Sequence, residues 1–403
     1  MDELVYPRER TLGKITLVLG SLIWLGLLIG TMGGLLIGLA IGFLAYLFAQ
    51  STLISYIKGN GVELSEAQFP DLYDQFKSCC AQLGIKKEPQ AFVLNGSGGL
   101  NAFATRFLGA QYVVLLSDVV DAMDKHPDGV RFYLGHELGH LRMNHLRGQL
   151  LRWPVLWLPL IGAAYSRAKE STCDRHGRAC CATPDGAARA LGALAAGSKR
   201  WQSLSISNFR KQAYHSKGFW MSFHELTGSY PWLTKRVTRV IDATGKVPGR
   251  HPLAYLLAAF VPYAGRLGGG FGVLILVYIV GVMAAVAIPA YKDYKTKAEL
   301  VGVVSETQDV LTALGRYYQA NQKVPDGLET AGLPPVLRGG ARLSLDARTM
   351  ILTVHTPRVE LVFTPEADTA GNIGWSCAGG EGVRAAQLPP NCRPAGSQVL
   401  SRP

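Results

Sequence analysis

Charged residues are scarce in this chain of 403 residues. Only 17% of the residues are Asp, Glu, Lys or Arg, whereas 48% are hydrophobic and the mean hydropathy is positive. This composition argues against an ordinary soluble enzyme and favours a protein with membrane-embedded parts. The formal net charge of +12 would suit nucleic acid or anionic lipid, but the sequence contains no nucleic-acid-binding motif. We therefore expect the lipid bilayer as a partner and no nucleic acid.

Charge is absent altogether from residues 15–49. One helix of this length would extend about 52 Å, whereas the hydrocarbon core of a bilayer is about 30 Å thick. Small residues at 30–34 offer a turn, so we predict a two-span hairpin, with a single span as the alternative. Residues 271–290 also lack charge and predict a further span. The apolar runs 153–165 and 253–263 contain proline and are too short to cross, which favours buried or interfacial helices.

Charges beside the spans predict how the chain is oriented. Positive residues favour the cytoplasmic side of a membrane, and three of them precede the first span: Arg8, Arg10 and Lys14. A hairpin then keeps the following globular part in the cytoplasm, and the span at 271–290 carries the C-terminal part outside. Three lysines that follow this span run against the same trend: Lys292, Lys295 and Lys297.

Cysteine positions agree with this orientation. Five of the seven cysteines lie before residue 182, four of them as adjacent pairs, which suits a reducing compartment. Cys377 and Cys392 enclose a short loop near the C-terminus and predict one disulfide bond in an oxidising space.

The periodicity of apolar residues predicts four parts. Residues 1–56 form a membrane anchor, and residues 57–250 form a mainly helical unit with short strands at 90–94 and 111–117. Residues 251–292 contain an interfacial segment and the last span. Residues 293–403 begin with a helix at 295–320, and alternation from Leu343 to Phe363 then predicts an antiparallel sheet, an α+β unit.

The stretch FYLGHELGHLRMNH contains His136, Glu137 and His140 in the spacing H-E-x-x-H. On a helix both imidazoles project from one face, one turn apart, so they can bind a single tetrahedral Zn²⁺. Glu137 is placed to accept a proton from a metal-bound water, and the resulting hydroxide can attack a peptide carbonyl. The alternative is a helix with two ordinary histidines.

A catalytic zinc needs a third protein ligand, and the position ten residues after His136 is Leu146 rather than histidine. His145 is one position off and is expected on another face of the same helix. We predict Glu170 as the third ligand and Asp174, one turn later, as the residue that fixes a histidine tautomer. The alternative is a solvated acidic face on that second helix.

HELGH at 136–140 followed by ESTCD at 170–174 resembles the membrane zinc metallopeptidases of the HtpX heat-shock protease and CAAX prenyl protease type, which are gluzincins. LNAFAT at 100–105 resembles the N-A-F-A element of that family. The resemblance implies a substrate-binding role, beside an edge strand that pairs with the substrate, for Asn101, Ala102 and Phe103.

SYPWLTKRV at 229–237 resembles the family's H-P-x-x-x-x-R segment. The resemblance implies catalytic roles for Tyr230 and Arg236. The family's usual histidine is Tyr230 here, and a phenol can still donate a hydrogen bond to an oxyanion.

The C-terminal part resembles a different family. Residues 269–300 look like the N-terminal helix of a type IV pilin, and GWSCAGG with LPPNCR resembles a pilin's disulfide loop. Counting from Phe271, the fifth position holds Ile275 where pilins have glutamate, and no basic residue directly precedes Gly270. The alternative is a generic span with a small α+β domain.

Together these features predict a mainly α membrane protein, with an α+β zincin-type peptidase domain and a C-terminal α+β pilin-like domain. We expect a multi-pass zinc endopeptidase of the bacterial inner membrane that binds one Zn²⁺ per chain and degrades unfolded or membrane polypeptides. Its peptidase domain would be cytoplasmic and its pilin-like domain periplasmic. The alternative is a membrane-anchored adaptor for pilin-system components, with an inactive protease fold.

Overall fold

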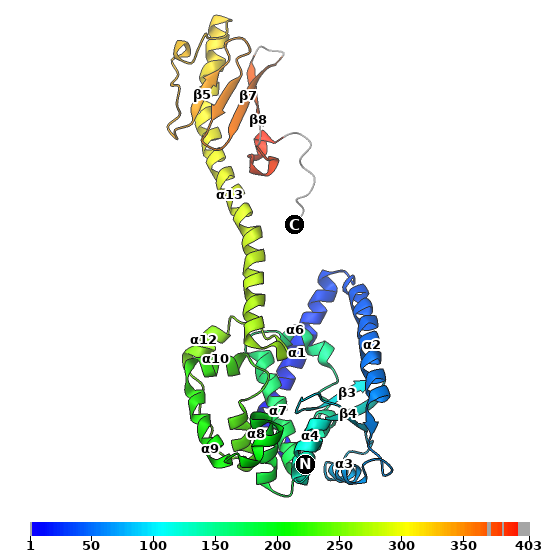
Figure 1. Cartoon of the computed structure of the whole chain (residues 1–403). Coiled ribbons are helices and arrows are strands. Elements are labelled where there is room, and N and C mark those ends of the chain that lie inside the picture. The colour runs from blue at the N-terminus through cyan, green and yellow to red at the C-terminus, as the bar shows by residue number, and fades with distance from the viewer. Residues whose placement is uncertain (1, 369–371, 381–382, 394–403) are drawn as a thin grey trace. The chain divides into compact units, whose positions relative to one another are not determined.

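The computed structural model describes residues 2–368, 372–380 and 383–393 (Figure 1). The chain divides into two compact units, Met1–Tyr278 and Ile279–Pro403. The first is mostly helical with one small sheet, and the second combines a long helix with a second sheet. The predicted fold class is confirmed. The four predicted parts divide the chain more finely than these two units, and their boundaries stay predictions.

The N-terminal residues form the expected helical hairpin (Figure 1). Helix α1 (Pro7–Gly30) and helix α2 (Leu35–Asn60) are separated by a turn in which Met32 and Gly33 have positive φ. Within the described residues, three helices are long and apolar enough to cross a membrane: α1, α2 and α13 (Gly268–Asn321). Their mostly exposed apolar surfaces fit a membrane protein.

Helix α1 is packed firmly into the first unit. It lies against α6 (Gln149–Leu156) and α7 (Ile161–Cys180). Gly20 permits the close approach, since a Cβ there would clash with the carbonyl oxygen of Leu151. The Trp24 indole donates a 2.7 Å hydrogen bond to the carbonyl of Leu150 and stacks on Trp153.

The sheet of the first unit has the order β1-β2-β4-β3. Strands β2 and β4 are parallel, and β3 pairs antiparallel with β4 at the sheet edge. The strands are β1 (Val62–Glu63), β2 (Gln90–Leu94), β3 (Ala102–Phe107) and β4 (Ala110–Leu116). The two strands predicted at 90–94 and 111–117 are therefore present as β2 and β4. On one face Val113 and Leu115 pack against Leu134 and Leu138 of the following helix α5, and on the other Ile57 of α2 covers Val114.

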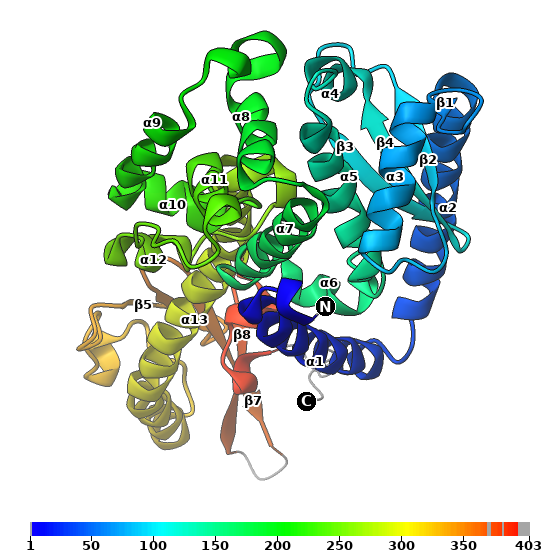
Figure 2. The ribbon, with the colours of Figure 1, turned by 90° about the horizontal axis from the view of Figure 1, so that it is seen from below.

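Helix α5 (Pro127–Arg142) and α7 lie side by side in the middle of the first unit (Figure 2). Glycines make this contact close. A Cβ at Gly139 would lie 3.0 Å from the Cβ of His176, and one at Gly177 would lie 2.6 Å from the carbonyl oxygen of Phe132. The two helix axes can therefore approach more closely than larger side chains would allow.

Shorter helices complete the first unit. They are α3 (Pro70–Gln82), α4 (Ser117–Ala122), α8 (Pro184–Arg200), α9 (Ile206–Lys211), α10 (Phe219–Thr227), α11 (Leu233–Ile241) and α12 (Pro252–Ala258). Helix α8 is capped by Thr183, whose hydroxyl accepts from the Gly186 amide. The two short apolar runs form α6 and α12 with the start of α7, and α6 and α12 are too short to cross a membrane, as expected.

In the second unit, α13 packs on the antiparallel sheet β5-β6-β7-β8. Its strands are β5 (Arg342–Leu345), β6 (Leu352–His355), β7 (Glu360–Ala367) and β8 (Ile373–Gly379). The helix expected at 295–320 is the continuation of the last span, because Pro289 does not break α13. Strand β8 was not predicted. Cys377 and Cys392 form the predicted disulfide bond, and the other five cysteines are free and buried.

We predict that Gly177→Ala lowers the free energy of unfolding by about 1–3 kcal/mol, because its Cβ would meet rigid backbone of α5. Gly59→Ala is the control, since a Cβ at this position of α2 meets nothing within 4 Å. Thermal unfolding in detergent measures both. Equal melting temperatures of the two variants would show that the α5–α7 contact tolerates a methyl group.

Candidate metal centre

The predicted ligands converge between α5 and α7. His136 and His140 lie one turn apart on α5, and Glu170 faces them from α7. The Nε2 atom of His136 is 3.2 Å from Oε2 of Glu170, and Nε2 of His140 is 3.7 Å from Oε1 of the same carboxylate. Oε2 of Glu170 is buried and makes no hydrogen bond in the described part of the chain. Two imidazole nitrogens and a carboxylate oxygen arranged in this way fit a catalytic zinc site.

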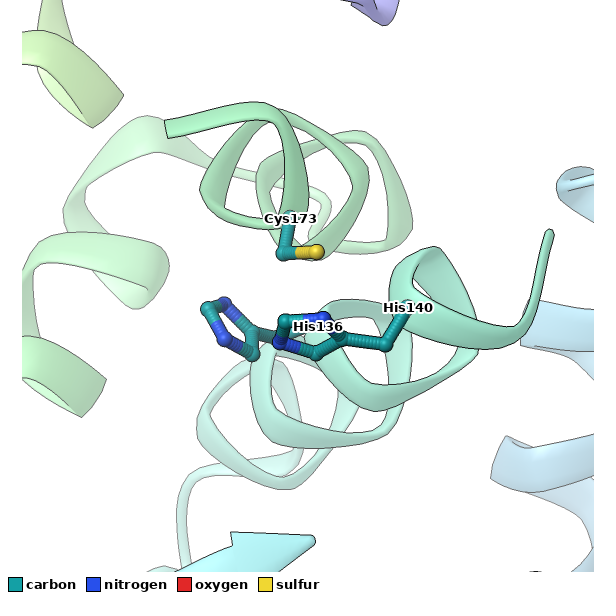
Figure 3. Close-up of side chains that lie close together, drawn as sticks. All are labelled: His136, His140 and Cys173. Carbon is teal, nitrogen blue, oxygen red and sulfur yellow. The ribbon is translucent and has the colours of Figure 1, made fainter. Parts of the chain in front are cut away.

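Cys173 is a second candidate for the third ligand. Figure 3 shows its sulfur facing His136 and His140 from α7, and one donor atom of each residue lies within 4.8 Å of the others. Burial raises the pKa of the Cys173 thiol well above its usual value, and the carboxylates of Glu170 and Glu137 add to this shift. A thiol is a poorer ligand than a thiolate. We therefore favour Glu170, whose carboxylate is already charged.

The pKa values of the three groups reflect their surroundings. Burial would raise the pKa of Glu170, but contact with His136 and the nearby His140 lower it to about 2. Burial lowers the pKa of His140 to about 3. Burial would also lower the pKa of His136, yet Asp174 and Glu170 raise it to about 10. The carboxylates of Asp174 and Glu170 thus stabilise positive charge at His136, and the same charges would favour a divalent cation beside it.

Asp174 supports His136 from the side away from Glu170. Its Oδ1 lies 3.1 Å from His136 Nδ1, so that nitrogen donates a hydrogen bond and Nε2 is left for a metal. Arg236 of α11 binds both oxygens of Asp174, with Nε 2.8 Å from Oδ2 and Nη2 2.7 Å from Oδ1. Asp174 thus has the predicted position, and the buried Arg236 guanidinium holds it there.

Glu137 and the predicted substrate residues border one cavity of about 720 Å³. His136 and His140 line the same cavity. The other predicted residues there are Asn101, Ala102, Phe103, Tyr230 and Arg236. Tyr230 is 40% exposed, and its ring centre lies 5.7 Å from the Arg236 guanidinium carbon. The structure therefore brings together every site residue expected in the peptidase part.

One residue that lines the cavity was not predicted from the sequence, and another that lies beside the ligands was misplaced. His224 of α10 also lines the cavity, and no sequence pattern pointed to it. His145 was expected on another face of the helix, and this is wrong. Helix α5 ends at Arg142, and Asn144 has a φ of +55°, so the chain turns and brings Nδ1 of His145 to 3.0 Å from Nδ1 of His140. An asparagine after a helix is the signal for such a turn.

Comparison with known proteins gives a family match. The model of peptidase family M48 matches residues 66–161, which include β2, β3, β4 and all of α5. This match supports a metallopeptidase. It ends at the first residue of α7, so Glu170 and Arg236 lie outside the matched stretch.

The chain is also similar to two sequences named type IV major pilin protein PilE1 from Neisseria gonorrhoeae. Each is 36% identical over 64 residues, which is 15% of this chain. The matched stretches cover 39% and 36% of those pilins, well under half of their length. These partial similarities give limited support to the expected pilin-like part.

Exchange of the two candidate third ligands distinguishes the two ligand sets. We predict that Glu170→Gln loses at least about 100-fold in zinc affinity, more than the roughly 10–100-fold typical of an outer-shell change. Cys173→Ser should retain zinc. The zinc content of the purified variants after desalting, by mass spectrometry, measures this. Retention by Glu170→Gln with loss in Cys173→Ser would assign the third ligand to the cysteine.

Proposed function

We propose that the protein is a membrane-bound zinc endopeptidase that hydrolyses unfolded or damaged membrane polypeptides, one zinc ion serving each chain. The observation that carries this proposal is the convergence of His136, His140 and Glu170 beside Glu137, on a cavity bordered by the sheet edge. The match to peptidase family M48 supports the hydrolase class. Quality control of membrane proteins is the role that fits three membrane-capable helices joined to a peptidase unit.

In this proposal the side chains of His136, His140 and Glu170 hold the metal. When bound, zinc would polarise the substrate carbonyl and lower the pKa of a water molecule, so that hydroxide is available as the nucleophile at neutral pH. Glu137 accepts the proton of the attacking water and then delivers it to the departing amine nitrogen. Its place on α5, directly after the ligand His136, keeps its carboxylate beside the ligand pair.

The substrate would bind as an added strand on β3. Strand β3 pairs with β4 on one side and is the last strand of its sheet. Because the Leu116 amide donates to the carbonyl of Asn101, the alternation of an antiparallel ladder directs the amide of Ala104 away from β4. An extended peptide can pair with this free edge, which borders the same cavity as Glu137.

Tyr230 and Arg236 take different roles in the proposal. The partly exposed phenol of Tyr230 borders the cavity and donates a hydrogen bond to the oxyanion. Arg236 is a positioning residue, because its guanidinium holds Asp174, which in turn holds His136.

We place the protein in the bacterial inner membrane, with the peptidase unit in the cytoplasm and the pilin-like part in the periplasm. The five free cysteines of the first unit and the disulfide bond of the second support this orientation.

A second candidate function is an adaptor for pilin-type machinery with an inactive protease fold. The similarity to PilE1 over 64 residues favours it. The presence of both histidines, Glu137 and Glu170 in one cluster argues against an inactive site. Binding of pilin components by a chain that neither holds zinc nor cleaves protein would favour the adaptor.

We predict that Glu137→Gln lowers the rate of casein cleavage by about 10²–10⁴-fold, because the amide cannot accept the proton of water. Its zinc content should equal that of the wild type, since Glu137 is not a ligand. Glu63→Gln, an exposed position on β1, is the control and should retain full activity. Undiminished cleavage by Glu137→Gln would refute the proposed mechanism.

Removal of one backbone donor tests the substrate strand. Ala104→Pro deletes the amide that faces the free edge and leaves the pairing of β3 with β4 in place, so the KM for casein should rise severalfold. Ala104→Ser keeps the amide and should behave as the wild type. If both variants have the wild-type KM, the substrate does not pair with this edge.

A further inference from the structure

We propose that the N-terminal membrane helix α1 completes the metal centre, because the carboxylate of Glu9, acting through His145, fixes the imidazole of His140 for metal binding. This inference rests on the metal site of the proposed function. It makes Glu9 and His145 positioning residues and makes α1 a structural part of the site as well as an anchor.

The three side chains form one continuous contact chain. Nδ1 of His140 lies 3.0 Å from Nδ1 of His145, and Nε2 of His145 lies 2.7 Å from Oε1 of Glu9. Glu9 is only 6% exposed and His145 only 5%, whereas Arg8 and Arg10 beside Glu9 are exposed. The sequence separation between Glu9 and His145 is 136 residues, so the contact depends on how α1 packs.

Only one arrangement of protons is compatible with a metal on Nε2 of His140. That imidazole must carry its proton on Nδ1, and it then donates to Nδ1 of His145. His145 must accept there, so its own proton is on Nε2 and is donated to the carboxylate of Glu9. A carboxylate at the end of the chain therefore selects the His140 tautomer that can bind a metal.

Cys173 also approaches His145, with its sulfur 3.6 Å from Nδ1. A thiol is a weak donor, and the imidazole N–H of His140 is both nearer and stronger. The thiol therefore competes poorly for the nitrogen, and the order of donors from His140 to Glu9 stands.

A buried carboxylate is costly unless it is paired. Glu9 forms an ion pair with His145, whose Nε2 lies 2.7 Å from Oε1 of Glu9. Glu9 is also held in place, because the Tyr6 amide donates to the Thr172 hydroxyl of α7 at 2.9 Å and Thr16 is fully buried. Its position is thus tied to the helix that carries Glu170.

The two histidine ligands are then supported from different parts of the fold. Asp174 and Arg236 hold His136 from within the peptidase helices, whereas Glu9 holds His140 from the membrane helix. Outer-shell partners of this kind orient a ligand and raise its basicity. The metal affinity should therefore depend on a residue of α1 that lies outside the H-E-x-x-H motif.

Zinc affinity of the detergent-solubilised full chain tests the inference, measured by competition with a chromophoric chelator. Glu9→Ala should weaken zinc binding by about 10–100-fold. Glu9→Gln should lose less, because its amide oxygen can still accept from His145, and it serves if the alanine variant fails to fold. Glu3→Ala, an exposed acid in the same N-terminal segment, is the control and should bind as the wild type.

A double-mutant cycle separates this role from a general loss of packing. If Glu9 acts through His145, Glu9→Ala combined with His145→Phe should bind zinc no more weakly than His145→Phe alone. Additive losses, or wild-type affinity in both Glu9 variants, would overturn the inference. A wild type that binds zinc but does not cleave casein would overturn only the proposed activity, whereas a wild type that binds no zinc would overturn both.

Discussion

The close contact between α5 and α7 is the constraint on which the rest of the site depends. Gly139 and Gly177 have no side chain to hold the two helices apart. The Nε2 atoms of His136 and His140 on α5 therefore lie 3.2 and 3.7 Å from the Glu170 carboxylate on α7. The free edge of β3 then borders the same cavity, because α5 also covers the sheet. Ligands, base and substrate edge are all positioned by one helix pair and the sheet under it.

The site concentrates buried charge, and each carboxylate has a specific partner. Asp174 lies between His136 and Arg236, Glu170 faces two imidazoles, and Glu9 faces His145. These buried carboxylates would destabilise the fold without their partners, because burial of an unpaired ion costs on the order of several kcal/mol. Within the described residues Oε2 of Glu170 faces His136 but makes no hydrogen bond, so it is available to a divalent cation. The charge pattern and the proposed chemistry therefore have the same physical basis.

Much of this was visible in the sequence, because helical spacing alone puts His136 beside His140 and Asp174 one turn after Glu170. The hairpin turn at 31–34, strand β2 and the disulfide bond followed equally from local patterns. The contact of His145 did not, since it depends on the positive φ of Asn144 and on Glu9, far away in sequence. Strand β8 was hidden because its small residues weaken the alternation. Cys173 was overlooked because its sulfur matters only once α7 faces α5.

The most direct test of the account is X-ray absorption at the zinc edge of the metal-loaded full chain. The account predicts only nitrogen and oxygen ligands, at about 2.0–2.2 Å from the metal, from His136, His140, Glu170 and solvent. A sulfur ligand at about 2.3 Å would assign Cys173 to the metal and contradict the central claim.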